Sequence, residues 1–384
     1  MVNTPKVYLD YNATTPVDQR VVDAMIPYFT ENFGNSGSDH VYGWEAQEAV
    51  DLARKQVSKL IGAKPSEIIF TSGATEAANM ALQGYCKAQK HKRNHIITCK
   101  TEHKAVLDPI NQLEQNGFDV TYLDVDYKGN INVSDLENAI KEQTVLVCLM
   151  LANNETGLIH PIKEIAKVVR KSYAVLMCDI TQAVGKVNVD IHDLDIDIAF
   201  FSAHKMYGPK GAGALFLNKN NQISIDPSFY GGGQEKGMRP GTLNIPAIVG
   251  FGKAADISFA KAEKESRSLS SLRDQLEGEL QDIPGAIINC QNESRLPNTT
   301  SISFKNTDGN KLIRRLKNIA VSRGSACTSV VMEPSHVLSA MGLEKDLAMA
   351  TLRISIGHPT TEQDIHLAVA EIKSAVNALQ FAEL

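Results

Sequence analysis

A lysine that follows an apolar run is the first residue whose setting suggests chemistry. Lys205 ends the motif Ser-Ala-His-Lys at residues 202–205, directly after an apolar run that ends at Phe201. A lysine at the end of a strand in a confined site can lose its proton and form a Schiff base with an aldehyde. A lone loop lysine is more often a solvated surface group, so this interpretation needs support from other motifs.

An acid follows a second apolar run upstream. Asp179 comes directly after Met177 and Cys178, and Gln182 lies three residues further along. Pyridoxal phosphate (PLP), an aldehyde cofactor, needs a carboxylate beside its ring nitrogen, because the protonated ring accepts carbanion electrons. Gln182 is close enough in sequence to hydrogen-bond the ring oxygen. A helix N-cap is the alternative role for Asp179, since acids are common there.

Further polar motifs also follow apolar runs. Residues 71–76, Thr-Ser-Gly-Ala-Thr-Glu, begin a predicted helix, where free N–H groups and the helix dipole favour an anion. A capping box explains them equally well. His103 could stack on a cofactor ring and exchange protons, although a solvent-facing histidine is the simpler explanation. The amides of residues 153–157 would add donors. Together the motifs predict a phosphate cradle, a ring stacker, an acid and a lysine in that chain order.

The apolar runs predict the elements that would hold these groups. Short β-type runs alternate with helical stretches through the first two thirds of the chain, which is typical of a mainly parallel sheet covered on both faces. Helices are expected at residues 44–61, about 256–282 and 362–379. Sites in such sheets lie beyond the carboxyl ends of strands, where the polar motifs occur. The β-type runs fall at residues 68–70, 95–99, 120–123, 145–151, 175–178, 196–201 and 212–217.

Length and composition predict two domains in a soluble protein. The 384 residues, 43% of them hydrophobic, are too many for one ordinary core, and we expect a large domain at 15–258 and a small one at 1–14 and 259–384. The net charge of −5 gives no sign of a nucleic-acid partner. No apolar run approaches the roughly 20 residues of a membrane span. Residues 1–11 carry no targeting signal, so the expected location is the cytoplasm.

Six cysteines are present, and none forms a CxxC pair, so no metal site is expected. Cys99, Cys148 and Cys178 lie in or beside apolar runs, where cysteine is usually a small core residue. Cys327 differs, because it lies in the small polar segment Ser-Arg-Gly-Ser-Ala-Cys-Thr-Ser at residues 322–329. Such a segment suits a nucleophile that must move between a site and an acceptor.

In these motifs the chain resembles the cysteine desulfurases of the IscS/NifS type, which are fold type I PLP enzymes of the class-V aminotransferase branch. The resemblance implies an α/β fold: a large domain with a mainly parallel seven-stranded sheet covered by helices, plus a smaller α+β domain. It also implies PLP as cofactor, L-cysteine as substrate and a homodimer. The matching motifs lie at residues 8–16, 33–35, 71–76, 101–104, 153–157, 179, 182, 202–205, 231–235, 239–244, 324–328 and 351–353.

The resemblance further implies a role for each matching residue. Lys205 would hold PLP and then remove the substrate α-proton, His103 would stack on the ring and transfer protons, and Cys327 would attack the substrate sulfur. Arg353 with Asn154 would bind the substrate carboxylate, for which a guanidinium fits well. The other cofactor-binding residues would be Ala74, Thr75, Ser202 and His204 at the phosphate, Thr242 of the partner subunit at that phosphate, Asp179 at the ring nitrogen and Gln182 at the ring oxygen.

The implied reaction converts L-cysteine to L-alanine and leaves sulfur as a persulfide on Cys327. An acceptor protein such as an iron–sulfur scaffold would then take the sulfur. Cys327 could touch a cluster transiently, although no resident metal is expected. Housekeeping family members run longer and use their tail at the scaffold, which leaves the acceptor and the pathway open. Arg323 stands where the family often has a small residue, and a cation there would favour the Cys327 thiolate.

Two other classes of function remain open. Another PLP reaction on this fold, such as that of a selenocysteine lyase, a cysteine sulfinate lyase or an aminotransferase, would share Lys205. An aminotransferase, however, has no need of Cys327. A non-catalytic scaffold for cluster assembly would not need Lys205, Asp179 and His103 together.

Overall fold

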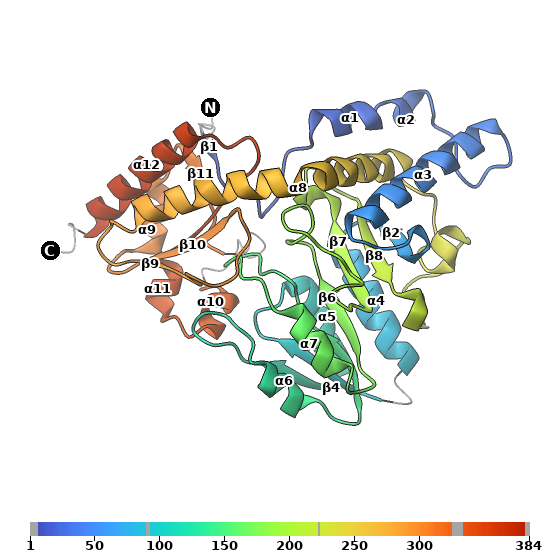
Figure 1. Cartoon of the computed structure of the whole chain (residues 1–384), viewed down its shortest axis with the longest axis horizontal. Coiled ribbons are helices and arrows are strands. Elements are labelled where there is room, and N and C mark those ends of the chain that lie inside the picture. The colour runs from blue at the N-terminus through green and yellow to red at the C-terminus, as the bar shows by residue number, and fades with distance from the viewer. Residues whose placement is uncertain (1–6, 90–92, 222, 325–332, 381–384) are drawn as a thin grey trace.

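A seven-stranded sheet forms the centre of the computed structural model, which describes residues 7–89, 93–221, 223–324 and 333–380 (Figure 1). Its strand order is β2-β8-β7-β6-β5-β3-β4. The neighbours from β7 to β4 are parallel, whereas β8 is antiparallel to both β7 and β2. The expected mainly parallel sheet is therefore confirmed. The strands are β2 (Ile68–Thr71), β3 (His95–Cys99), β4 (Asp119–Leu123), β5 (Thr144–Cys148), β6 (Val175–Asp179), β7 (Ile198–Ser202) and β8 (Gly213–Leu217).

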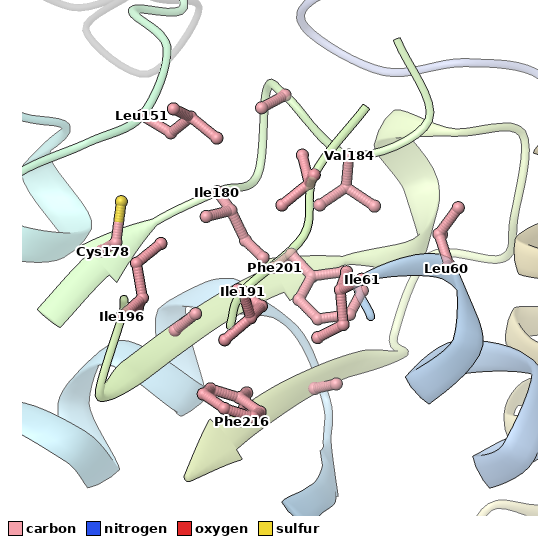
Figure 2. Packing of buried hydrophobic residues seen from close by; sticks show 14 of the residues in the cluster. Leu60, Ile61, Leu151, Cys178, Ile180, Val184, Ile191, Ile196, Phe201 and Phe216 are labelled. Atoms are coloured by element: carbon pink, nitrogen blue, oxygen red, sulfur yellow. The ribbon is translucent and has the colours of Figure 1, made fainter. Parts of the chain in front are cut away.

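Both faces of this sheet are buried, because side chains alternate along each strand and helices cover each side. Phe201 of β7 lies in one apolar cluster with Phe216 and Ile61 (Figure 2). Its neighbour Phe200 lies in a second cluster with Met177. The first cluster includes α3 (Val41–Leu60), α7 (Ile162–Val169) and the start of α8 (Ile245–Leu280), and the second includes α4 (Ala74–Gln89) and α5 (Lys104–Gln115).

The helix α8 extends from the sheet to a second core (Figure 1). It starts at Ile245, so the expected start near residue 256 was wrong. Asn244 caps the helix, since its Oδ1 accepts a hydrogen bond from Ala247 N, and Pro246 occupies the first turn, where proline is tolerated. The later leucines of α8, including Leu276, belong to the second core.

The second core joins the two ends of the described chain. Strands β9 (Ala286–Ile288), β10 (Thr299–Phe304) and β12 (Thr351–Ser355) form an antiparallel sheet, and β1 (Val7–Tyr8) pairs with β11 (Ile319–Ala320). The predicted domain boundary at residue 258 falls inside the uninterrupted α8 and stays a prediction. The remaining α-helices are α1 (Gln19–Met25), α2 (Pro27–Thr30), α6 (Val133–Ala139), α9 (Gly309–Arg315), α10 (His336–Ala340), α11 (Lys345–Met349) and α12 (Glu362–Gln380).

Membrane insertion through a helix has no support in the described ranges. None of the helices there is both long and apolar enough to cross a bilayer.

Candidate active site

A cavity of about 230 Å³ lies beyond the carboxyl ends of the sheet strands. Ten of the predicted site residues line this cavity, and they come from segments of both cores. They are Ala74, Thr75, His103, Asn154, Asp179, Gln182, Ser202, His204, Lys205 and Arg353.

Two predicted residues are not among those that line the cavity. Thr242 is exposed; the prediction placed it in the site of a partner subunit and stays a prediction. Cys327 falls outside the described residues, so its predicted role also stays a prediction.

One end of the cavity is the N-terminus of α4. Ala74 N donates a hydrogen bond to Ser202 Oγ at 2.7 Å, which joins the turn after β2 to the end of β7. Glu76 Oε2 accepts from Ser72 N at 3.0 Å, so a capping contact is present beside the cavity residues. The first turn of a helix presents free N–H groups and a positive dipole end, which together favour an anion such as a phosphate.

His204 lies at the same end and is oriented by the N-terminal segment. Its Nδ1 is 3.1 Å from Thr14 Oγ1. Burial and the neighbouring cations, Lys205 first among them, lower the pKa of His204 to about 4. The imidazole is therefore neutral near pH 7 and would contact an anion by hydrogen bonding rather than by charge.

Asp179 and His103 form the middle of the cavity. Asp179 Oδ1 accepts a hydrogen bond from Thr181 N at 2.8 Å, and burial raises the pKa of this carboxyl, while the contact with Thr181 and the nearby His103 act against that rise. His103 caps α5, since its Nδ1 accepts from Ala105 N at 3.0 Å. Burial lowers the pKa of His103. With Nδ1 as acceptor, the neutral ring carries its proton on Nε2.

Lys205 ends a single turn of 3-10 helix, Ala203–Lys205, that directly follows β7. Its Nζ donates to the backbone carbonyls of Asn12 and Ala13, both at 2.7 Å. The N-terminal segment thus fixes the amine in the cavity, at the strand end that the sequence predicted.

Arg353 reaches the cavity from β12 of the second core and is 2% exposed. Its Nη2 forms an ion pair with Asp10 Oδ1 at 2.7 Å, and its Nη1 donates to the carbonyl of Asn154 at 3.3 Å. Its Nε is buried and has no hydrogen-bond partner within the described ranges. Each Nη nitrogen carries a second N–H beyond these contacts, which a carboxylate bound in the cavity would accept.

Sequence reasoning assigned no role to three polar residues at this site: Asp10, Asn12 and Lys186. Asn12 Nδ2 donates to the Asn154 carbonyl at 3.1 Å and to Thr299 Oγ1 at 2.9 Å, which joins the two cores. Asp10 and Asn12 lie in the motif at residues 8–16, which matches the family but suggests no contact by itself. The partners of Asn12 lie far along the chain, so no local sequence pattern signals these contacts.

The residues that flank the undescribed segment 325–332 both meet Glu155. Gly324 has φ +111°, and a Cβ there would lie 2.9 Å from Glu155 Oε2, so only glycine fits. Ser335 Oγ donates a hydrogen bond to the same carboxylate. Glu155 directly follows Asn154 of the cavity wall, so the chain on both sides of residues 325–332 comes close to the cavity, and Ser335 is hydrogen-bonded there.

Arg323, the predicted neighbour of Cys327, contacts α9. Its Nη1 donates to Asn310 Oδ1 at 2.5 Å. This amide partner is uncharged and leaves the guanidinium charge uncompensated by that contact.

Comparison with known proteins shows close relatives across nearly the whole chain. Residues 7–367 match the model of the family described as aminotransferase class-V. The cysteine desulfurase IscS of Anaeromyxobacter sp. (strain Fw109-5) is 45% identical over 376 residues, which cover 97% of this chain and 93% of that protein. The cysteine desulfurase IscS of Rickettsia bellii (strain OSU 85-389) is 47% identical over 97% of this chain and 92% of that protein.

Solved structures agree with the sequence relatives. A NifS-like protein superposes with a TM-score of 0.91 at 38% identity, over 97% of this chain and 99% of that one. SspA in complex with cysteine superposes with a TM-score of 0.82 at 35% identity, over 91% of this chain and 98% of that one. This chain therefore belongs to the class-V aminotransferase family and, within it, to the cysteine desulfurases of the IscS/NifS type.

Proposed function

We propose that the chain is a PLP-dependent cysteine desulfurase that converts L-cysteine to L-alanine and retains the sulfur as a persulfide on Cys327. The observation that carries this proposal is the convergence of Lys205, Asp179 and His103 in a cavity that ends at the N-terminus of α4. The IscS relatives are named cysteine desulfurases, and the related SspA is in complex with cysteine.

The cavity residues fit PLP at three points. The N-terminus of α4 with Ser202 suits the phosphate, Lys205 suits the aldehyde, and Asp179 suits the ring nitrogen. Asp179 supports the fit most directly, because burial raises its pKa and a cationic ring nitrogen would offset that cost. Gln182 lines the same cavity and would meet the ring oxygen.

With PLP bound, three residues of the chain would each handle a different proton of the reaction. When bound, PLP supplies an acceptor for the electrons released at the substrate α-carbon. Lys205 Nζ, held by the carbonyls of Asn12 and Ala13, would take the α-proton. Asp179 would keep a proton at the ring nitrogen. His103 has its Nδ1 committed to Ala105 N, so its Nε2 side is left for proton exchange.

Arg353 and Cys327 would act on the substrate itself. Arg353, which lines the cavity, would bind the substrate carboxylate through its guanidinium N–H groups. The Cys327 thiolate would attack the substrate sulfur, so that an S–S bond forms as the bond between sulfur and the β-carbon breaks. The electron pair stays with the carbon fragment, which takes up a proton and leaves as alanine. Free cysteine and one enzyme thiol thus give alanine and one enzyme persulfide.

The partners and compartment are part of the same proposal. A homodimer would let Thr242 of one subunit complete the phosphate site of the other. The persulfide sulfur would pass to an acceptor protein such as an iron–sulfur scaffold in the cytoplasm. The naming of the relatives as IscS supports a role in iron–sulfur cluster assembly.

One experiment tests the reaction directly. The protein is incubated with L-cysteine, alanine is quantified, and the mass of the Cys327 peptide is measured for an added sulfur atom. We expect alanine and a persulfide at Cys327. Pyruvate, or transamination that depends on a keto acid, would contradict the desulfurase and favour an aminotransferase.

A further inference from the structure

Lys186 is a buried lysine that the reaction outlined above does not use. It is the only lysine in the described ranges that is buried, with 8% of its surface exposed. Its Nζ donates to two side-chain amide oxygens, Gln182 Oε1 at 2.6 Å and Asn12 Oδ1 at 3.1 Å. Burial, together with nearby Lys205 and Arg353, holds the pKa of Lys186 well below its usual range. Burying a lysine amine costs free energy, so we expect Lys186 to have a role in the neighbouring cavity.

Lys186 contacts the oxygens of two side-chain amides, and Gln182 depends on it more than Asn12, whose amide also contacts Asn298, Asn154 and Thr299. A lysine nitrogen in this setting donates hydrogen bonds, so both amides must turn their oxygens toward it. The nitrogen of Gln182 then points the other way, and its Nε2 donates to the Asn12 carbonyl at 3.1 Å. That same carbonyl accepts from Lys205 Nζ. Lys186 therefore contacts the glutamine of the cavity directly and is linked to Lys205 through Asn12.

The orientation of the Gln182 amide matters because its oxygen accepts hydrogen bonds and its nitrogen donates them. Its side chain lines the cavity, and the amide nitrogen has a second hydrogen beyond the one given to Asn12. An ionised ring oxygen needs a donor. Without Lys186 the amide could rotate and present its oxygen, which would repel that ring oxygen.

We infer that Lys186 is a positioning residue of the cofactor site, which holds Gln182 with its N–H toward the PLP ring oxygen and binds the side chain of Asn12, the residue whose backbone carbonyl accepts from Lys205. This inference rests on the proposed PLP-dependent function and adds a residue to it. Lys186 acts through Asn12 and Gln182 and need not touch the cofactor.

Cofactor binding, rather than turnover, is the first test. Apo forms of the full chain are titrated with PLP, and the dissociation constant and the visible absorption band are recorded for Lys186→Met and Lys186→Gln. Lys186→Met removes the donor, so the constant should rise about tenfold, with a shifted band, as expected for a buried hydrogen bond left unmade. Lys186→Gln keeps one donor and should show a rise of about threefold. The exposed-lysine control, Lys253→Met, should match the wild type.

A double-mutant cycle separates positioning from general support of the fold. Gln182→Leu is combined with Lys186→Met, and the PLP dissociation constants of all four proteins are compared. If Lys186 acts through Gln182, the double variant should bind PLP no more than about twofold worse than Gln182→Leu. Fully additive losses, or a lower melting temperature with an unchanged band and constant, would overturn the inference.

The remaining outcomes are also decisive. If Lys186→Met does not fold, Lys186→Gln decides alone, and wild-type binding with a wild-type band would overturn the inference. A wild-type protein that binds no PLP would overturn the proposed function and this inference with it. Normal PLP binding by the wild type and by both Lys186 variants would overturn the inference alone.

Discussion

The two walls of the cavity are held in place in different ways. On the sheet wall, Asp179 and His103 are each fixed by a backbone N–H only two residues away. On the opposite wall, Arg353 is paired with Asp10, which is 343 positions distant, and next to that wall Ser335 is paired with Glu155, which is 180 positions distant. Local turns after strands therefore fix Asp179 and His103, whereas Lys205 on the same wall is held by the carbonyls of Asn12 and Ala13 in the N-terminal segment. The substrate and sulfur wall exists only once both cores have folded together.

Among the variants that test the difference between the two walls, Lys205→Ala should show the largest loss of activity. Lys205→Ala should lower turnover about 10³-fold or more, because the amine that holds the cofactor and takes the α-proton is gone. It should also remove the absorption band of lysine-bound PLP. Cys327→Ser, on the opposite wall, should lose alanine production but keep that band. Absorption spectra and alanine assays on both variants check this, and a Cys327→Ser protein without the band would break the division between the walls.

Arg353 should give the next largest effect. Arg353→Lys keeps a positive charge but loses the fork that binds a carboxylate and pairs with Asp10, so KM for cysteine should rise about 10²-fold. The PLP band should stay in place, because the sheet wall does not depend on this side chain. Steady-state kinetics give KM and kcat separately. Loss of PLP, with KM unchanged, would show that Arg353 serves the cofactor instead.

The same division explains what the sequence could and could not predict. Lys205 and Asp179 were found because each follows an apolar run, and strand ends in such sheets carry sites. The partnership of Asn12 with Lys186 spans 174 positions, and a lysine four residues after Gln182 gives no sign that it is buried. The early start of α8 was missed because Asn244 and Pro246 are weaker signals than the leucine repeat that follows.

Ser335 should give a smaller effect, confined to the sulfur wall. Ser335 caps α10, since its Oγ accepts from Val337 N and Leu338 N, and it also donates to Glu155. Ser335→Ala should cost about 1 kcal/mol of unfolding free energy, as expected for a lost cap. It should also slow persulfide formation, because one flank of residues 325–332 is released.

Denaturant unfolding and single-turnover persulfide assays measure the two effects of Ser335→Ala. Glu155→Gln is the matched control, because an amide oxygen can still accept from Ser335 Oγ. This control should keep most of the stability and most of the rate. A change in the PLP band for either variant would contradict the independence of the walls.

Replacing Arg323 should give the smallest effect, a change in the reactivity of the Cys327 thiol, on which the positive charge of Arg323 would act. A nearby cation favours a thiolate, so the wild-type thiol should have the lower pKa, and Arg323→Ala should raise the midpoint of Cys327 alkylation against pH by about half a unit. At pH 7 less thiolate would then be present, and alkylation would be slower.

Arg323→Lys keeps the charge and should keep the midpoint. Asn310→Ala removes the amide that accepts from Arg323 and tests whether that contact aims the guanidinium. Because the interaction is electrostatic, added salt should shrink the difference between wild type and Arg323→Ala. An unchanged midpoint in Arg323→Ala would mean that Cys327 owes its reactivity to other groups.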